Sequence, residues 1–182
     1  LEFSDAQSVF DHWLSDESVT DNLIKGAHKT VSETIERVTK IVSDYGSKEF
    51  CYWGIELKAN SELIGAIDFF NFDNTTENCE VGYSIGYKWW NQGYGTEALR
   101  AVVEFGFRHM NIHKISAALN LDNGASGKIM SKVGMLQEGT IRHMIRNSKN
   151  QYKDCAVYGI LQEDYDKHNV VRTHTSIHKI EL

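Results

Sequence analysis

Trp90-Asn91-Gln92-Gly93-Tyr94-Gly95-Thr96 stands between a strand-like run and the start of an amphipathic helical run. Two glycines at such a junction let the backbone turn tightly and approach a ligand without a Cβ atom in the way. The helix that follows presents unpaired N–H groups and the positive end of its dipole, and both attract anions. The segment therefore indicates a pyrophosphate site, although a flexible helix start without a ligand has the same spacing.

Two familiar phosphate-binding signatures are absent around this segment. The chain has no Gly-x-x-x-x-Gly-Lys-Ser/Thr, which excludes a P-loop. Ala98 replaces the third glycine of the dinucleotide-binding pattern. Dinucleotide-binding sites tolerate an alanine at this position. The sequence before Ala98, however, predicts β-hairpins and not a parallel β-α-β unit. A dinucleotide-binding fold is therefore not favoured.

The apolar periodicity predicts an α/β (α+β) fold with a mixed sheet flanked by helices. Helical spacing begins after Ser4-Asp5 and again after Thr30. Strands are predicted over 50–57, 63–70, 79–87, 114–120, 135–146 and 152–161, and helices over 93–110 and 123–133, the last ending at Gly134. Helices and strands in this order are typical of one mixed domain.

Composition limits the classes of function that remain. No repeat or linker divides the chain, so one domain is expected over 1–182. The formal net charge is −6 without a block of like charges, which argues against a nucleic-acid binder. No run approaches the roughly 20 apolar residues that span a bilayer, so no membrane association is expected. A start without a secretory pattern and three widely spaced cysteines, Cys51, Cys79 and Cys155, predict a cytoplasmic protein with reduced thiols.

Further blocks of sequence accompany the glycine segment in a fixed order. They are EVGYSIG at 80–86, WNQGYGTEAL at 90–99, DNGAS at 122–126, KVGM at 132–135, Glu138-Gly139 with Arg142, and Tyr152-x-Asp154 with Tyr158. Together they resemble the acetyl-CoA motif of the GNAT superfamily. Their residue types are those of its RimJ/RimL branch, the ribosomal-protein N-terminal acetyltransferases. Several collinear blocks carry far more weight than one glycine loop.

The resemblance implies a GNAT fold, a mostly antiparallel sheet splayed at its centre with acetyl-CoA in the splay. The pantetheine would run beside Tyr83 to Gly86. The cofactor-binding residues implied are Ser84, Ile85, Gly86, Gln92, Gly93, Tyr94, Gly95, Thr96, Asn123 and Ser126. No metal is implied, and the pairs His109 with His113 and His174 with His178 lack further ligands at metal-binding spacing.

Two features depart from the family pattern. The loop usually begins with Gln or Arg where this chain has Trp90, and an aromatic residue there is usual in the RimJ/RimL branch. Relatives open with a short strand before the first helix, so we expect this strand to be missing and 165–182 to form a peripheral tail.

Amine acetylation needs a neutral amine, a polarised thioester carbonyl and a proton for the leaving thiolate. In the family the amine attacks directly, so no cysteine is needed as an acyl carrier. The resemblance implies an oxyanion-stabilising backbone amide near Ser84 to Gly86. Met130 replaces the general-acid tyrosine of many relatives, and Ser126 matches the serine proposed for that role in this branch. The alternative is that Ser126 only caps a helix.

The general base stays open. Ile145 occupies the position of a glutamate that serves some relatives. Glu80 begins the central strand, where many relatives carry a proton-relaying carboxylate, and His143 has an ordinary pKa of about 6.5 that suits the task. Each of the two is otherwise a surface or turn residue, and that interpretation is modestly favoured for His143.

These inferences predict an acetyl-CoA-dependent N-acetyltransferase acting on a primary amine. By family association alone the acceptor is a protein N-terminus, with polyamines and aminoglycosides as alternatives. A CoA-binding sensor without catalysis is the rival from another class, because the tyrosine is missing and the base is unplaced. The expected partners are acetyl-CoA and an amine acceptor, and the sequence leaves open whether the chain forms a homodimer.

Overall fold

The computed structural model describes residues 1–167 apart from 22, 24, 48 and 49. Its centre is a six-stranded sheet in the order β1-β2-β3-β4-β6-β5. The strands are β1 (Cys51–Glu56), β2 (Leu63–Asp73), β3 (Asn78–Ile85), β4 (Lys114–Asn120), β5 (Leu136–Arg146) and β6 (Tyr152–Leu161). Only β3 and β4 pair parallel. The predicted mixed, mostly antiparallel sheet is confirmed.

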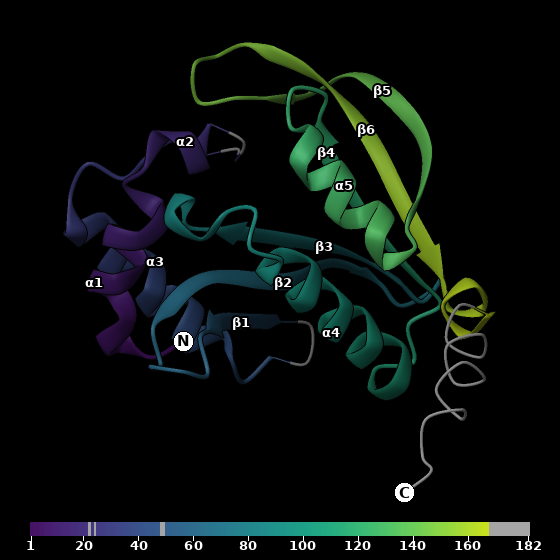
Figure 1. Ribbon diagram of the computed structural model, residues 1–182, viewed down its shortest axis with the longest axis horizontal. Coiled ribbons are helices and arrows are strands. Elements are labelled where there is room, and N and C mark those ends of the chain that lie inside the picture. The colour runs from purple at the N-terminus through teal and green to yellow at the C-terminus, as the bar shows by residue number, and fades with distance from the viewer. Residues whose placement is uncertain (22, 24, 48–49, 168–182) are drawn as a thin grey trace, which may run out of the picture.

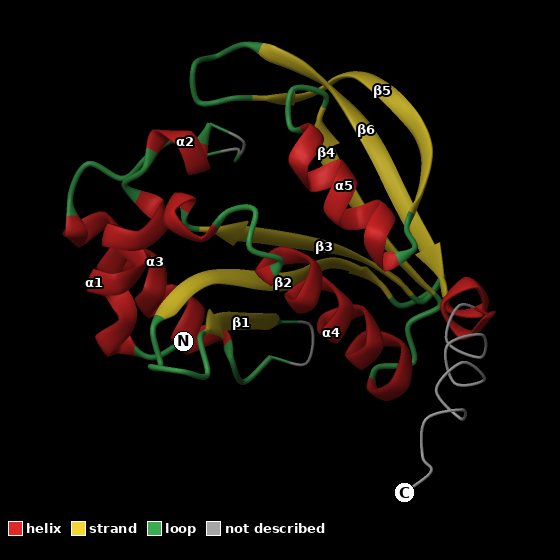
Figure 2. Ribbon diagram, viewed as in Figure 1, coloured by secondary structure: helices red, strands yellow, loops and turns green. Residues whose placement is uncertain are grey.

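Helices cover both faces of the sheet (Figures 1 and 2). One face carries α4 (Tyr94–His109) and α5 (Gly124–Val133), and the other carries α3 (Val31–Asp44) with the short elements that open the chain. Those short elements are η1 (Phe3–Asp5), α1 (Ala6–Val9), η2 (Phe10–Leu14) and α2 (Glu17–Thr20), and η3 (Tyr87–Trp89) follows β3. Within the described residues, no helix combines the length and apolarity that crossing a membrane requires.

Two hydrophobic cores follow from the alternation of side chains along β2. Ile67 and Phe69 pack with Leu99 of α4, whereas Ala66 packs with Val38 of α3. Leu99 is fully buried, and burial of a side chain of that size stabilises the fold by about 1.5–3 kcal/mol. Because successive strand residues point to opposite faces, Asp68 and Phe70 share the α3 face with Ala66. The irregularity between Phe70 and Asp73 then brings Phe72 to the α4 face.

The structure differs from the sequence-based expectation at both ends. The α-helix α1 begins after Asp5, as predicted, but a 3₁₀ turn from Phe3 precedes it, in which the Glu2 N–H donates to Asp5 Oδ2 at 2.7 Å. Tyr165, the first residue of the predicted tail, is buried in the main core, and its ring centroid lies 5.4 Å from that of Phe107. Residues 168–182, including both histidines noted in the tail, lie outside the described residues.

Candidate functional site

The glycine segment forms a tight left-handed turn that ends in α4. Gly93 is the N-cap of α4 and has φ +93°, a conformation that residues with a Cβ avoid. Two side chains hold the turn in place: Trp90 Nε1 donates to the Ile85 carbonyl at 2.7 Å, and Gln92 Nε2 donates to the Lys88 carbonyl at 2.9 Å. A Cβ on Gly93 would meet nothing within 4 Å, so the space beside the turn is open.

Four consecutive amides at this turn donate to no group of the described residues. They are the backbone N–H groups of Gln92, Gly93, Tyr94 and Gly95. The Thr96 amide, which the resemblance assigned to the same anion, already donates to the Gly93 carbonyl at 3.0 Å. Unpaired amides at a helix N-terminus attract anions through their N–H groups and the helix dipole.

The structure shows why position 95 holds a glycine, which the sequence did not reveal. It is buried, and a Cβ there would lie 2.9 Å from Ile129 Cδ1 of α5. The two helices therefore approach each other closely at the first turn of α4. The glycine permits helix packing, whereas Gly93 provides the left-handed turn.

The sheet splits along β3, the strand that leads to this turn. Strands β3 and β4 pair at only three positions, the last being Glu80 with Ser116. From there β3 continues along β2 and β4 continues along β6, and the two diverge (Figure 1). The central splay that the resemblance implied is confirmed.

One edge of β3 consequently faces the splay with unpaired backbone groups. The Gly86 N–H donates to the Ile64 carbonyl at 2.9 Å, so Gly86 is bonded to β2 and cannot serve as an oxyanion donor. Backbone groups in an antiparallel ladder alternate in direction, which places the amides of Tyr83 and Ile85 toward the splay. Within the stretch from Ser84 to Gly86, the amide of Ile85 is therefore the one directed into the splay.

The N-terminus of α5 closes the other side of the splay. Asn123 caps this helix, since its Oδ1 accepts from the Ser126 N–H at 3.3 Å. The alternative that Ser126 is the capping residue is therefore wrong. Tyr83 spans the gap by donating its hydroxyl to the Ser126 carbonyl at 3.2 Å, and burial raises the pKa of Tyr83 to about 12. The Ser126 hydroxyl itself bonds to no group of the described residues, which leaves it available to a ligand.

The structure distinguishes the two sequence candidates for the general base. Glu80 lies on the α3 face at the last paired position of β3, where its Oε1 accepts from Asn71 Nδ2 at 3.0 Å. His143 lies in an irregular part of β5 with φ +51°, is exposed, and stacks on Tyr152 with 5.3 Å between centroids. No hydrogen bond, ion pair or ring contact of the described residues joins His143 to β3 or α5, whereas Glu80 lies on β3 where the strands begin to part.

Sequence reasoning missed Asp68, a carboxylate on the α3 face of β2. It pairs with Gly82 of β3, and its Oδ1 lies 3.2 Å from the place where a Cβ on Gly82 would stand. Burial raises the pKa of Asp68 to about 6, although the positive charge of Arg37 on α3 acts in the opposite direction. A charged residue inside the apolar run Ile64 to Phe70 was the available signal.

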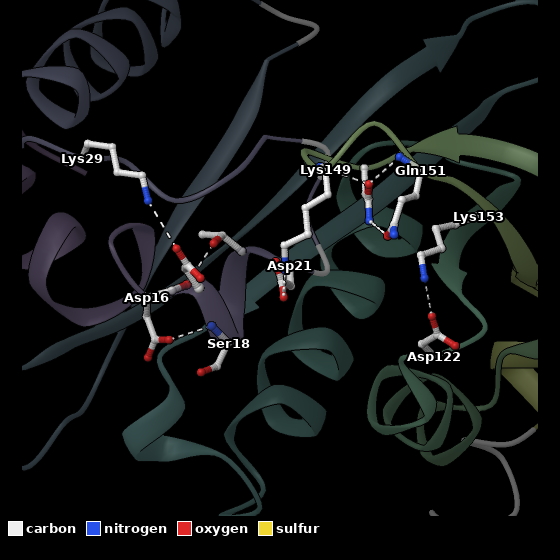
Figure 3. A network of polar contacts seen from close by, with 11 residues as sticks. Asp16, Ser18, Asp21, Lys29, Asp122, Lys149, Gln151 and Lys153 are labelled. Atoms are coloured by element: carbon white, nitrogen blue, oxygen red, sulfur yellow. Dashed lines mark hydrogen bonds and ion pairs between the residues drawn. The ribbon is translucent and has the colours of Figure 1, made fainter.

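Two ion pairs join the last hairpin to other parts of the chain. Lys149 Nζ lies 2.8 Å from Asp21 Oδ2, just beyond α2, and Lys153 Nζ lies 2.8 Å from Asp122 Oδ2 before α5 (Figure 3). Gly26 packs against Ser148, since a Cβ on Gly26 would stand 2.9 Å from Ser148 Cβ. Figure 1 shows α2 beside the β5–β6 turn at the wide end of the splay.

The cysteines and the potential metal ligands of the described residues do not gather into one cluster. The described residues contain no group of three or more His, Cys, Asp or Glu side chains arranged for a metal ion. Cys79 is buried, and burial raises the pKa of its thiol to about 12; the pKa values of Cys51 and Cys155 are raised for the same reason. Thiols held in the protonated form are poor nucleophiles.

Comparison with known proteins agrees with this geometry. The family model described as acetyltransferase (GNAT) domain matches residues 1–136, most of the chain. The protein belongs to the GNAT family. It is an N-acetyltransferase by this membership, and acetyl-CoA is the acyl donor that GNAT enzymes use.

Its GNAT relatives include an uncharacterized N-acetyltransferase and an enzyme whose acceptor is named. The uncharacterized N-acetyltransferase YoaA of Bacillus subtilis is 30% identical over 158 residues, covering 87% of this chain and 88% of that protein. The [ribosomal protein uS5]-alanine N-acetyltransferase of Escherichia coli is 35% identical over 115 residues, covering 63% of this chain and 59% of that enzyme.

Solved GNAT structures superimpose closely on the fold. An acetyltransferase from Bacillus anthracis has a TM-score of 0.79 at 30% identity, with 90% of this chain and 92% of that chain covered. The spermidine N-acetyltransferase of Vibrio cholerae, solved with CoA and spermine, has a TM-score of 0.77 at 18% identity, with 91% and 94% covered. At that identity the likeness shows the fold alone.

Proposed function

We propose that this GNAT enzyme transfers acetyl from acetyl-CoA to a primary amine, with a protein N-terminal α-amine as the favoured acceptor. The observation that carries the proposal is the row of four free amides at residues 92–95, which lies next to Ile85 on the part of β3 that has left β4. A diphosphate fits that row, and the open edge of β3 suits the amide groups of a pantetheine arm. The similarity to the uS5-alanine enzyme supports the acceptor class.

The chain's own residues supply three functions in this proposal. The Ile85 amide, directed into the splay, stabilises negative charge on the thioester oxygen. Ser126 donates a proton to the departing sulfur, since its hydroxyl is otherwise unbonded. Asn123 holds the first turn of α5, and with it Ser126, against Tyr83.

Substitutions at Gly93 test the anion site directly. Asp and Asn both tolerate a left-handed φ and have the same shape, and the space beside Gly93 is open. Gly93→Asp places a carboxylate at the free amides, so we expect CoA to bind at least 10-fold more weakly than to Gly93→Asn. Calorimetric titration with CoA at low and high salt measures the difference, which should shrink as salt screens the charge. Equal CoA affinity of the two variants would contradict this placement.

Acceptor class is decided by one acetylation assay. Release of the CoA thiol is measured with N-terminal peptides, including Ala-initiated ones, against polyamines and aminoglycosides. Turnover on peptides supports the proposal, and turnover on a small amine alone replaces the acceptor while keeping the chemistry. Tight CoA binding without turnover on any amine identifies the non-catalytic sensor.

A further inference from the structure

Asp68 lies at the splay because of a glycine on the neighbouring strand. Gly82 is two residues beyond Glu80, the last residue of β3 that pairs with β4. Its missing side chain leaves room for the Asp68 carboxylate, since a Cβ there would stand 3.2 Å from Oδ1 and 3.1 Å from the ring of Phe70. The carboxylate therefore lies across β3 where the sheet is already open.

No group of the described residues neutralises this carboxylate at close range. No described donor hydrogen bonds to it, and no lysine, arginine or histidine nitrogen among them lies within 4.0 Å. The ionisable groups that face it are Arg37 from α3, Tyr52 directly opposite on β1, and Glu80 on β3. A half-buried carboxylate without a donor is costly, and an ammonium group would supply one.

We infer that Asp68 receives the acceptor's ammonium group and removes its proton, an inference that rests on the proposed function. An N–H bond of the ammonium breaks and an O–H bond forms on Asp68, which leaves the nitrogen lone pair free to attack the thioester carbonyl carbon. The carbon–sulfur bond then breaks. The attacking nitrogen loses a second proton as the sulfur gains one through Ser126, so the products are the amide, the free thiol and one proton that Asp68 passes to water.

The position of Asp68 separates it from the other candidates. Glu80 is held by Asn71 at the closed end of the splay, and His143 is stacked on Tyr152. Asp68 lies over the open part of β3, on the face opposite α4 and α5. Acetyl-CoA and the amine could therefore approach the splay between β3 and β4 from opposite faces of the sheet. Its pKa, raised by burial to about 6, leaves the carboxylate ionised at neutral pH and basic enough to take a proton.

The pH dependence of kcat/KM tests this role with Asp68→Asn and Glu80→Gln. With an amine of known pKa, the wild-type profile should rise near pH 6 as Asp68 ionises and level or fall as the free ammonium form of the acceptor is depleted. Asp68→Asn should lose the limb near pH 6 and follow the neutral amine alone, with kcat/KM at pH 7 reduced about 100-fold. Glu80→Gln should keep that limb.

A second variant leaves Asp68 in place. Gly82→Ala puts a methyl group against the carboxylate, so kcat/KM should fall at least fivefold while the CoA affinity stays within twofold. A limb near pH 6 that persists in Asp68→Asn with kcat/KM within threefold of wild type overturns the inference, as does its loss in Glu80→Gln instead. Acetylation of N-terminal peptides by the wild type upholds the proposed function independently of Asp68, so the two failures are distinguishable.

Discussion

The backbone N–H and carbonyl of Ser126 form hydrogen bonds, whereas its hydroxyl forms none within the described residues. Its N–H is capped by Asn123 and its carbonyl accepts from Tyr83, so the hydroxyl is positioned by contacts that do not consume it. We expect Ser126→Ala to leave the CoA dissociation constant within twofold and to lower kcat about 100-fold or more, as for loss of a general acid. Steady-state kinetics and CoA titration measure the two quantities.

Ser131→Ala is the matched control on the same helix. Its hydroxyl donates to the Gly127 carbonyl at 2.9 Å and has no part in the proposed chemistry. Unchanged kinetics in both variants would leave Ser126 without a catalytic role.

The residues of the site could be predicted from sequence only in part. Gly93 was identifiable because a glycine before an amphipathic helix is a local pattern. Asp68 was not, because its environment arises from Arg37 on α3 and from Gly82 on another strand, and no spacing along the chain brings these together. The reason for Gly95 was hidden likewise, since it depends on Ile129 of α5.

At the scale of elements, long periodic segments were predicted well and short ones were not. The range of β4 and the end of α5 at Gly134, which has φ +102°, agree with the apolar pattern. The four-residue α2 is stabilised by local hydrogen bonds, such as that from the Ser18 N–H to Asp16 Oδ1 at 2.8 Å. A helix this short shows little apolar periodicity in the sequence. The splay was implied by family resemblance, because no periodicity shows where two strands part.

The contact between α2 and the β5–β6 turn yields a prediction at this scale. Lys149 and Asp21 are both well exposed, so the pair stabilises the fold little and mainly fixes the hairpin beside the splay. Lys149→Asp sets two carboxylates against each other, and we expect the acceptor KM to rise roughly two- to fivefold while CoA affinity is unchanged. The charge swap Asp21→Lys with Lys149→Asp should restore KM. A KM increase that survives both the swap and high salt would point to a different cause.

For the whole molecule, the buried charge of Asp68 sets a pH dependence of stability. Burial raises the pKa of this carboxyl to about 6 in the folded state, above its ordinary 3.8, so the folded protein binds the proton more tightly than the unfolded chain does. The resulting stabilisation is fully present below pH 3.8 and is lost as the pH rises through 6. Asp68→Asn carries no charge, and we therefore expect it to be more stable than wild type at pH 7.5 by about 1–3 kcal/mol and nearly equal at pH 4.

Asp73→Asn, on the same strand, should behave in the opposite way. Hydrogen bonds from Thr76 and Thr75 lower the pKa of Asp73, so its contribution to stability is present above the ordinary pKa and is lost as the pH falls. Urea unfolding of both variants from about pH 2 to pH 8 measures the two trends, because the pKa of folded Asp73 lies below its ordinary 3.8. An Asp68→Asn protein that is less stable than wild type at pH 7.5 would mean that the ionised carboxylate is well satisfied in the native fold. Its readiness to accept a proton from an amine would then lack a physical basis.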